Sequence, residues 1–222
     1  MSEQDQNGFM VFSGTANLPL AEKVAAYLGK PLNKIDIRHF PDGETFCQVQ
    51  EGVRGRDVFV IQSGSPSPNE AYMELFIIMD ALKRGSAARI TAVVPYYGYA
   101  RQDRKAAPRE PITAKLVADL LTAAGADNII AIDLHQDAIQ GFFDKPVNHM
   151  TAMPIFVDYF EQKGFKSEEL CVVSPDVGRA KAAKKFSTLL DCDIAIMHKD
   201  RPKHNQAEIT ALIGDVKDKI CI

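Results

Sequence analysis

The stretch Asn128-Ile-Ile-Ala-Ile-Asp-Leu-His135 decides the fold class of this 222-residue chain. Its isoleucine-rich run is typical of a strand buried on both faces, and the polar residues Asp133 and His135 follow it directly. The same order, an apolar strand that opens into a polar turn, recurs at residues 58–62, 90–94, 170–173 and 194–197. Because helical segments separate these strands, the sequence predicts an α/β fold with parallel sheets and helices on both faces.

Two cycles of this pattern divide the chain. Apolar residues at helical spacing predict helices over residues 18–28, 70–83, 113–123, 153–162 and 179–190. Further strands are predicted at 9–12, 35–39 and 47–49. The repetition predicts two domains, 1–150 and 151–222. Residues 219–222 resemble the opening of another buried strand, so we expect the second domain to be incomplete and the chain to be a fragment.

Composition excludes several classes of protein. Hydrophobic residues make up 46% and charged residues 25%, which is typical of a globular protein, and the net charge of −3 argues against a large nucleic-acid footprint. The sequence has neither a long apolar run for a membrane span nor an apolar signal segment at its start. No cysteine pair has CxxC spacing, so we expect buried thiols in a reducing cytoplasm, at Cys47, Cys171, Cys192 and Cys221.

Common nucleotide and hydrolase motifs are absent from the sequence. It contains no GxxxxGK[ST] phosphate loop and no GxGxxG turn after a strand. It also lacks a GxSxG nucleophile elbow and an HExxH zinc helix. Open parallel sheets bind their ligands beyond the carboxyl ends of the strands, and the polar turns of this sequence lie in that position.

Two of these turns carry acidic residues. Asp133 and His135, two residues apart after a strand, could share a metal ion. Asp suits Mg²⁺, whereas His is a less typical ligand for it. Asp176, in Ser174-Pro-Asp176, could be a second metal ligand or could bind a sugar hydroxyl. The alternative for both turns is a helix N-cap, with a hydrogen-bonded structural histidine at position 135.

Two further segments are rich in cations. Residues 96–105, Tyr-Tyr-Gly-Tyr-Ala-Arg-Gln-Asp-Arg-Lys, offer guanidinium groups that match phosphate oxygens, and Gln102 and Asp103 could contact a base or ribose. Lys199 and Arg201, two apart after a strand, would point the same way in an extended chain and could stabilise a transferring phosphoryl group. A solvated basic loop is the alternative for each segment.

The segment Phe40-Pro-Asp-Gly-Glu44 lies between two predicted strands. On its own it predicts a hairpin turn with Gly43 at a positive φ angle.

Taken in order, these segments resemble the ribose-phosphate diphosphokinases, also called PRPP synthetases. The resemblance covers residues 9–222 and rests on Phe40-Pro-Asp-Gly-Glu44, Val53-Arg-Gly55, residues 95–105, Asp133-Leu-His135, Gln140-Gly-Phe-Phe-Asp144, Ser174-Pro-Asp176 and Lys199-x-Arg201.

The resemblance implies a reaction and an architecture. The reaction is transfer of the diphosphoryl group of ATP to the C1 hydroxyl of ribose 5-phosphate, which gives PRPP and AMP. The architecture is two domains of the type I phosphoribosyltransferase fold, the first on the ATP side and the second on the ribose-phosphate side. The resemblance also implies dependence on Mg²⁺ and a ring-like homo-oligomer, a hexamer built from dimers. It implies no nucleic-acid or membrane partner.

The resemblance also implies roles for individual residues. A neighbouring subunit would present the 40–44 turn to the adenine of ATP, through Phe40, Asp42, Gly43 and Glu44. The main subunit would hold ATP through Arg101, Gln102 and Asp103. His135 and Asp176 would be metal-linked, with Asp133 beside them. Lys199 and Arg201 would belong to a mobile catalytic loop, and Arg201 would also contact the substrate.

Family members continue beyond Ile222 into a glycine- and threonine-rich loop that binds the phosphate of ribose 5-phosphate. We therefore expect ATP binding by the first domain, whereas the ribose-phosphate loop lies outside this sequence. Two alternatives remain open at this point. One is a non-catalytic regulatory subunit or inactive fragment of the same family, and the other is a phosphoribosyltransferase that acts on a nucleobase.

Overall fold

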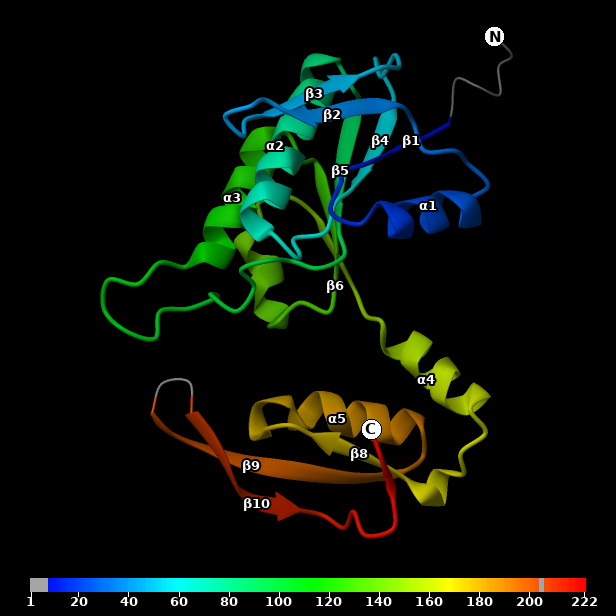
Figure 1. Ribbon diagram of the computed structural model, residues 1–222, viewed down its shortest axis with the longest axis vertical. Coiled ribbons are helices and arrows are strands. Elements are labelled where there is room, and N and C mark those ends of the chain that lie inside the picture. Colours follow the sequence, from blue (N-terminus) through cyan, green and yellow to red (C-terminus); the bar gives the residue numbers. More distant parts are fainter. Residues whose placement is uncertain (1–7, 204–205) are drawn as a thin grey trace. The chain divides into compact units, whose positions relative to one another are not determined.

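The computed structural model describes residues 8–203 and 206–222, without the side chains of residues 199–203 and 206–210. The chain divides into two compact units, residues 1–151 and 152–222 (Figure 1). Each unit has its own sheet.

The first unit is built on a five-stranded parallel sheet. The strand order is β1-β4-β5-β6-β7, and every neighbouring pair is parallel. The strands are β1 (Met10–Ser13), β4 (Asp57–Ile61), β5 (Arg89–Val94), β6 (Asn128–Ile132) and β7 (Val147–Met150). The predicted strands were confirmed, and β7 is an additional strand at the edge of the sheet.

Helices cover both faces of this sheet (Figure 1), as predicted. On one face lie α2 (Pro68–Arg84) and α3 (Thr113–Ala124), and on the other lies α1 (Leu18–Tyr27). Side chains alternate along each strand, so neighbouring residues enter different cores. Phe12, Val58 and Val60 pack with α2, whereas Val11 and Ile61 pack with α1. The short 3₁₀ segment η2 (Asp137–Phe142) precedes β7.

A separate antiparallel hairpin packs against α2. It consists of β2 (Ile35–His39) and β3 (Thr45–Val49). One face of the hairpin carries Ile35, Ile37, Cys47 and Val49, which pack against the main core. The hairpin is therefore anchored by its inner face, while residues 40–44 at its tip stay exposed.

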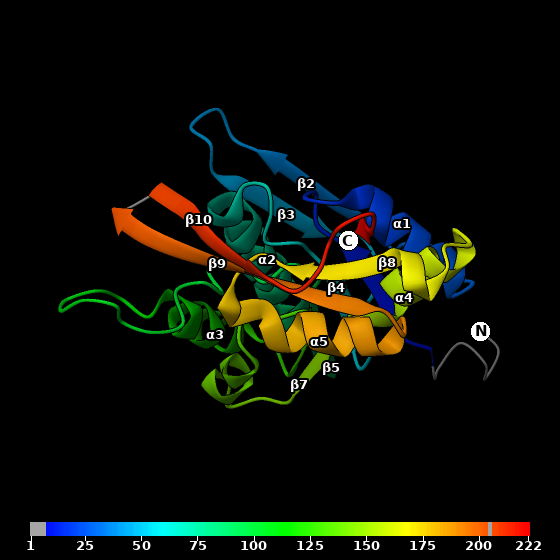
Figure 2. The same cartoon turned by 90° about the horizontal axis from the view of Figure 1, so that it is seen from below.

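The second unit has a smaller, mixed sheet in the order β10-β9-β8-β11. Helix α5 (Ala180–Leu189) lies over β8 and β9 (Figure 2). The remaining elements are α4 (Met153–Gln162), η3 (Ser167–Glu169), β8 (Leu170–Ser174), η4 (Val177–Arg179), β9 (Asp193–Lys203), β10 (Gln206–Ile213) and β11 (Ile220–Cys221). Strands β8, β9 and β11 are parallel as expected, whereas β10 pairs with β9 in the antiparallel sense.

Three expectations about the second unit and the cysteines need correction. The strand predicted to end at Met197 continues to Lys203, because β10 pairs with its second half. The terminal strand β11 does form, but it is exposed rather than buried. All four cysteines are free thiols, and yet Cys171 alone is fully buried, while Cys221 is exposed. Burial, with smaller contributions from Glu74 and Asp36, raises the pKa of the Cys47 thiol to about 11.

Within the described residues, no helix has both the length and the apolar character that crossing a membrane requires.

Candidate functional site

Polar segments gather at the carboxyl edge of the first unit's sheet. Backbone hydrogen bonds join the segments that follow neighbouring strands. The Gln62 N–H donates to the Val93 carbonyl at 2.9 Å, and the Gly64 N–H donates to the Tyr96 carbonyl at 2.8 Å. The strands are parallel, so the segments after β4, β5 and β6 share one edge, which is where open α/β sheets bind ligands.

Tyrosines fix the base of the long loop between β5 and α3. The hydroxyl of Tyr72 donates to the Gly98 carbonyl at 3.3 Å, and its ring stacks on that of Tyr99 with centroids 6.2 Å apart. The hydroxyl of Tyr97 donates to the Ala114 carbonyl at 3.0 Å. Burial raises the pKa of both Tyr72 and Tyr97 well above the ordinary range, so both hydroxyls stay protonated. The tyrosines are thus structural anchors for the basic segment.

The 101–103 segment follows these anchors directly. Gln102 accepts from the Ala114 N–H through its carbonyl at 3.1 Å, and its side-chain oxygen accepts from the Thr113 hydroxyl. Gln102 therefore binds groups at the first turn of α3 that the helix itself leaves without partners. Arg101 is exposed and Asp103 is half-buried beside it. An exposed guanidinium on a fixed backbone can bind phosphate oxygens in pairs.

The 133–135 turn lies at the end of the neighbouring strand β6. Asp133 has a φ of +46°, in the left-handed region, and its Oδ1 accepts from the Thr151 hydroxyl at 2.8 Å. The Leu134 N–H donates to Nε2 of His149 at 3.0 Å. His149 therefore carries its proton on Nδ1, which lies 3.6 Å from Oδ1 of Asp137. Two residues at the end of β7 thus hold the turn in a strained conformation.

The structure also shows which of the acidic residues cap a helix. Asp133 is not a helix N-cap, since Gln136 occupies that position before η2. Asp176 is an N-cap, because its Oδ1 accepts from the Arg179 N–H at 3.0 Å. Asp133 and His135 belong to the first unit and Asp176 to the second. In the part of the chain that the structure describes, no three His, Cys, Asp or Glu side chains come together as a metal cluster.

A buried polar network near the same edge was not predicted from the sequence. Glu74 is only 3% exposed, although it lies on a helix with a strong apolar face. Its carboxylate accepts from the Thr15 N–H at 2.6 Å, from the Thr15 hydroxyl at 2.7 Å and from Nε2 of Gln62 at 2.7 Å. These three donors satisfy the buried charge. The only available signal was a Glu on the apolar face of the helix predicted over 70–83.

The tip of the β2–β3 hairpin forms the predicted turn. The Gly43 N–H donates to the Phe40 carbonyl at 2.9 Å, and Gly43 has a φ of +92°, which favours glycine. Phe40 is 49% exposed and packs edge-on against Phe46. Asp42 accepts from the Glu44 N–H at 3.2 Å. The tip lies at the opposite end of the unit from the carboxyl ends of the strands (Figure 1).

The two cations proposed for catalysis, Lys199 and Arg201, lie in the second half of β9. The Lys199 backbone pairs in register with Ile209 of β10. The side chains of Lys199 and Arg201 lie outside the described part of the chain.

The five-stranded parallel sheet of the first unit, with helices on both faces and polar segments at its carboxyl edge, is typical of α/β proteins that bind ligands at the ends of their strands. A family profile for the N-terminal domain of ribose phosphate pyrophosphokinase matches residues 9–125. The chain is 56% identical over 216 residues to ribose-phosphate pyrophosphokinase of Fusobacterium nucleatum, covering 97% of this chain and 68% of that protein. It is 49% identical to ribose-phosphate pyrophosphokinase of Thermotoga maritima, covering 97% of this chain and 69% of that protein.

A solved structure of a similarly named enzyme also matches this chain. The crystal structure of phosphoribosylpyrophosphate synthetase from Mycobacterium smegmatis superposes with a TM-score of 0.86 at 46% identity, covering 97% of this chain and 70% of that one. The chain therefore belongs to the ribose-phosphate pyrophosphokinase family.

Proposed function

We propose that this chain transfers the diphosphoryl group of ATP to the C1 hydroxyl of ribose 5-phosphate, producing PRPP and AMP. The observation that carries the proposal is the 56% identity that extends across 97% of the chain, through both units. A match confined to the first unit would have supported nucleotide binding alone. In this proposal the first unit lies on the ATP side and the second on the ribose-phosphate side.

ATP binding is assigned to the 101–103 segment and to the hairpin tip. Arg101 is exposed, follows a tyrosine-anchored turn and can form paired hydrogen bonds with the phosphates. Phe40 is 49% exposed at the hairpin tip and can offer its aromatic ring to another molecule, so a second copy of the chain would supply it to the adenine. The proposal therefore requires a homo-oligomer, which we take to be a hexamer built from dimers. The four free thiols of the chain are typical of a protein in a reducing cytoplasm, which is the location that we propose.

Magnesium is the proposed cofactor. Asp133 fits it, because its exposed carboxylate is oriented by the Thr151 hydroxyl and offers the oxygen ligand that Mg²⁺ prefers. His135, in the same turn, is a further proposed metal-linked residue of the first unit, and Asp176 is the metal-linked residue proposed for the second unit. The bound ion would neutralise phosphate charge, while the protein's own groups orient the two substrates.

Lys199 and Arg201 are proposed to stabilise the charge that develops on the transferring group. Phosphoryl transfer needs little covalent help from the protein, so positioning and charge stabilisation account for most of the catalysis. A cation directed at the transferring oxygens acts in the transition state more than in the ground state. Arg201 would also contact the sugar substrate.

The test is AMP production by this 222-residue chain with ATP, Mg²⁺ and ribose 5-phosphate. We expect Lys199→Ala to raise the barrier by about 2–4 kcal/mol, the size of one oxyanion-type donor. Lys217→Ala is the matched control, because Lys217 is an exposed cation of the same unit with no proposed role.

Two outcomes would count against the proposal. Absence of AMP production would remove the catalytic assignment from this chain, and equal turnover of the parent and Lys199→Ala would remove Lys199 from the mechanism. ATP binding is measured separately by equilibrium dialysis. We expect Arg101→Gln to weaken ATP binding whether or not the chain turns over.

A further inference from the structure

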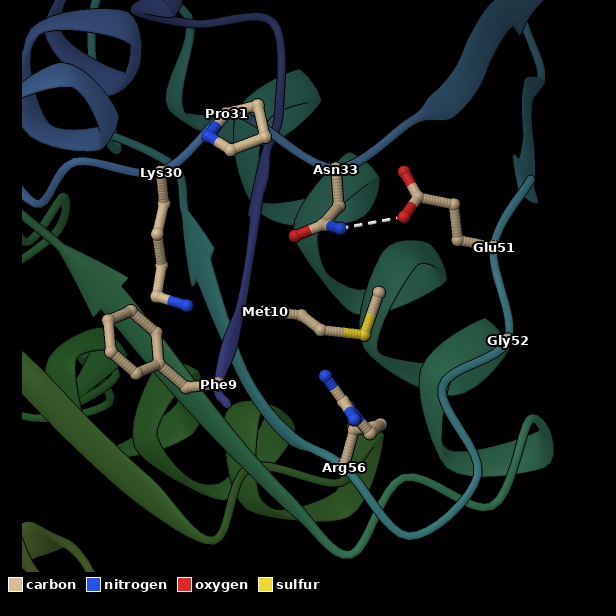
Figure 3. Close-up of a pocket in the computed structure, with 8 residues that line it drawn as sticks. All are labelled: Phe9, Met10, Lys30, Pro31, Asn33, Glu51, Gly52 and Arg56. Atoms are coloured by element: carbon tan, nitrogen blue, oxygen red, sulfur yellow. Dashed lines mark hydrogen bonds between the residues drawn. The ribbon is translucent and has the colours of Figure 1, made fainter. Parts of the chain in front are cut away.

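A cavity lies at the other edge of the first unit's sheet, where the strands begin. It has a volume of about 320 Å³, at the lower end of the range for small-molecule sites. Its walls come from the starts of β1 and β4 and from the segments that follow α1 and β3 (Figure 3). The lining residues are Phe9, Met10, Lys30, Pro31, Asn33, Glu51, Gly52 and Arg56. This edge is opposite the proposed ATP-binding edge.

Two cationic side chains converge on this cavity. A Cβ atom placed on Gly8 would lie 3.5 Å from Nζ of Lys30 and 3.7 Å from Nη2 of Arg56. The two charged groups therefore approach the same point in space. Lys30 also lies over the ring of Phe9, with Nζ 4.7 Å from the centroid, which orients its ammonium group. In Figure 3 both side chains extend toward Met10.

Glu51 also lines the cavity, and its carboxylate is hydrogen-bonded to the segment that follows α1. One oxygen of Glu51 accepts from Nδ2 of Asn33 at 2.7 Å, and the other accepts from the Lys34 N–H at 2.5 Å. Asn33 is itself fixed, because its Oδ1 accepts from the Val11 N–H at 2.9 Å. Glu51 thus uses both oxygens to join two loops, and among the described residues that line the cavity two cations, Lys30 and Arg56, stand against this one carboxylate.

The rest of the wall is apolar. Phe9 and Pro31 flank Lys30, and the side chain of Met10 lies beside the end of Arg56 in Figure 3. Met10 is only 6% exposed and belongs to the hydrophobic core, so this wall is rigid. A ligand that fits must therefore combine a compact anion with a small apolar or aromatic body.

We propose that this cavity binds a small phosphomonoester. One tetrahedral phosphate can accept from the ammonium of Lys30 and from the guanidinium of Arg56 at once, and its dianionic charge offsets the repulsion between them. The apolar body of the ester would pack against Phe9 and Met10. The site is separate from the proposed catalytic edge and does not depend on the reaction proposed above.

The experiment uses methionine methyl NMR on the full chain, with phenyl phosphate as the probe. The chain has seven methionines, and Met10→Leu identifies the Met10 signal. We expect phenyl phosphate to shift the Met10 methyl in a saturable way, phenol to leave it unmoved and inorganic phosphate to bind more weakly than the ester. Lys30→Gln and Arg56→Gln should each weaken binding of the ester at least about tenfold, as expected for loss of a charge-assisted hydrogen bond.

Lys34→Gln is the matched control, because Lys34 contributes only its backbone N–H to Glu51 and its side chain does not line the cavity. It should bind the probe like the parent. The proposal fails if Met10 does not respond, if phenol moves it as strongly as the ester, or if both glutamine variants bind like Lys34→Gln. Inorganic phosphate that binds as tightly as the ester would refute the role of the apolar wall.

Discussion

The two units of this chain bury their helices to very different extents. In the first unit, α2 has seven buried residues, among them Leu75, Ile78, Met79 and Leu82 with no exposed surface. In the second, α4 has no buried residue, and the one buried residue of α5 is Ser187. Large apolar side chains of α4 remain exposed, including Ile155 at 69% and Phe156 at 53%.

This difference indicates where the stability of the chain resides. Burial of apolar surface is the main favourable term in folding, so the first unit should account for most of the free energy of unfolding. Segments with few buried contacts open locally at lower free energy. We therefore expect the second unit to open locally at a lower free energy than the first.

The largest expected effect comes from the core of the first unit. Leu75 is fully buried between α2 and the sheet, so Leu75→Ala leaves a cavity that its neighbours fill only partly. We expect a loss of about 2–5 kcal/mol in the free energy of unfolding. Urea unfolding followed by tyrosine fluorescence measures it, because Tyr159 is the only tyrosine of the second unit and the other five lie in the first.

Met73→Ala is the control on the same helix. Met73 is 55% exposed, so its truncation should change stability by less than about 0.5 kcal/mol. Equal losses for the two variants would show that α2 does not form the core as described.

The sequence predicted this first unit better than the second, for a physical reason. In a sequence, strands that are buried on both faces appear as continuous β-branched runs. Core helices appear as apolar residues spaced three and four apart. The edge strand β7 was missed because Val147 and His149 alternate with exposed residues, which is a weak signal over four residues. In the second unit, β10 was missed and β9 was predicted too short, because polar residues 198–203 read as a turn.

The candidate site, too, could be predicted from the sequence only in part. The polar residues after β5 and β6 were predicted at one edge, because parallel strands place their carboxyl ends together. The partners that hold them were not predicted. Gln102 binds the first turn of α3 and His149 binds the backbone of Leu134, and both contacts join segments at least eleven residues apart. Only the folded structure defines such contacts.

An intermediate effect is expected at His149, which links β7 to the 133–135 turn. His149→Ala removes the acceptor of the Leu134 N–H, and we expect a loss of about 0.5–1.5 kcal/mol, the usual net contribution of one hydrogen bond. Hydrogen exchange at the Leu134 amide measures the local effect, and its protection should fall. Asn148→Ala is the control, since Asn148 is on the same strand and its side chain donates to Oδ1 of half-buried Asn128 rather than to the 133–135 turn.

His149→Gln separates this contact from general damage to the edge strand. A glutamine side chain offers an oxygen acceptor and so should restore part of the Leu134 protection. If His149→Ala and Asn148→Ala lowered that protection equally, the role of His149 in positioning the turn would be lost, and the strain at Asp133 would need another explanation.

The smallest expected effect is at α4, and it tests the comparison most directly. Ile155→Ala removes the same kind of side chain as Ile78→Ala, but Ile155 is 69% exposed and Ile78 is fully buried. We expect a change within about 0.5 kcal/mol for Ile155→Ala and a loss of several times that for Ile78→Ala in matched urea titrations. A large loss in the free energy of unfolding for Ile155→Ala would mean that another surface, from this chain or from a second chain, covers α4 in solution. The second unit would then depend on that contact for part of its stability. The difference in helix burial between the two units would then hold only for the isolated chain.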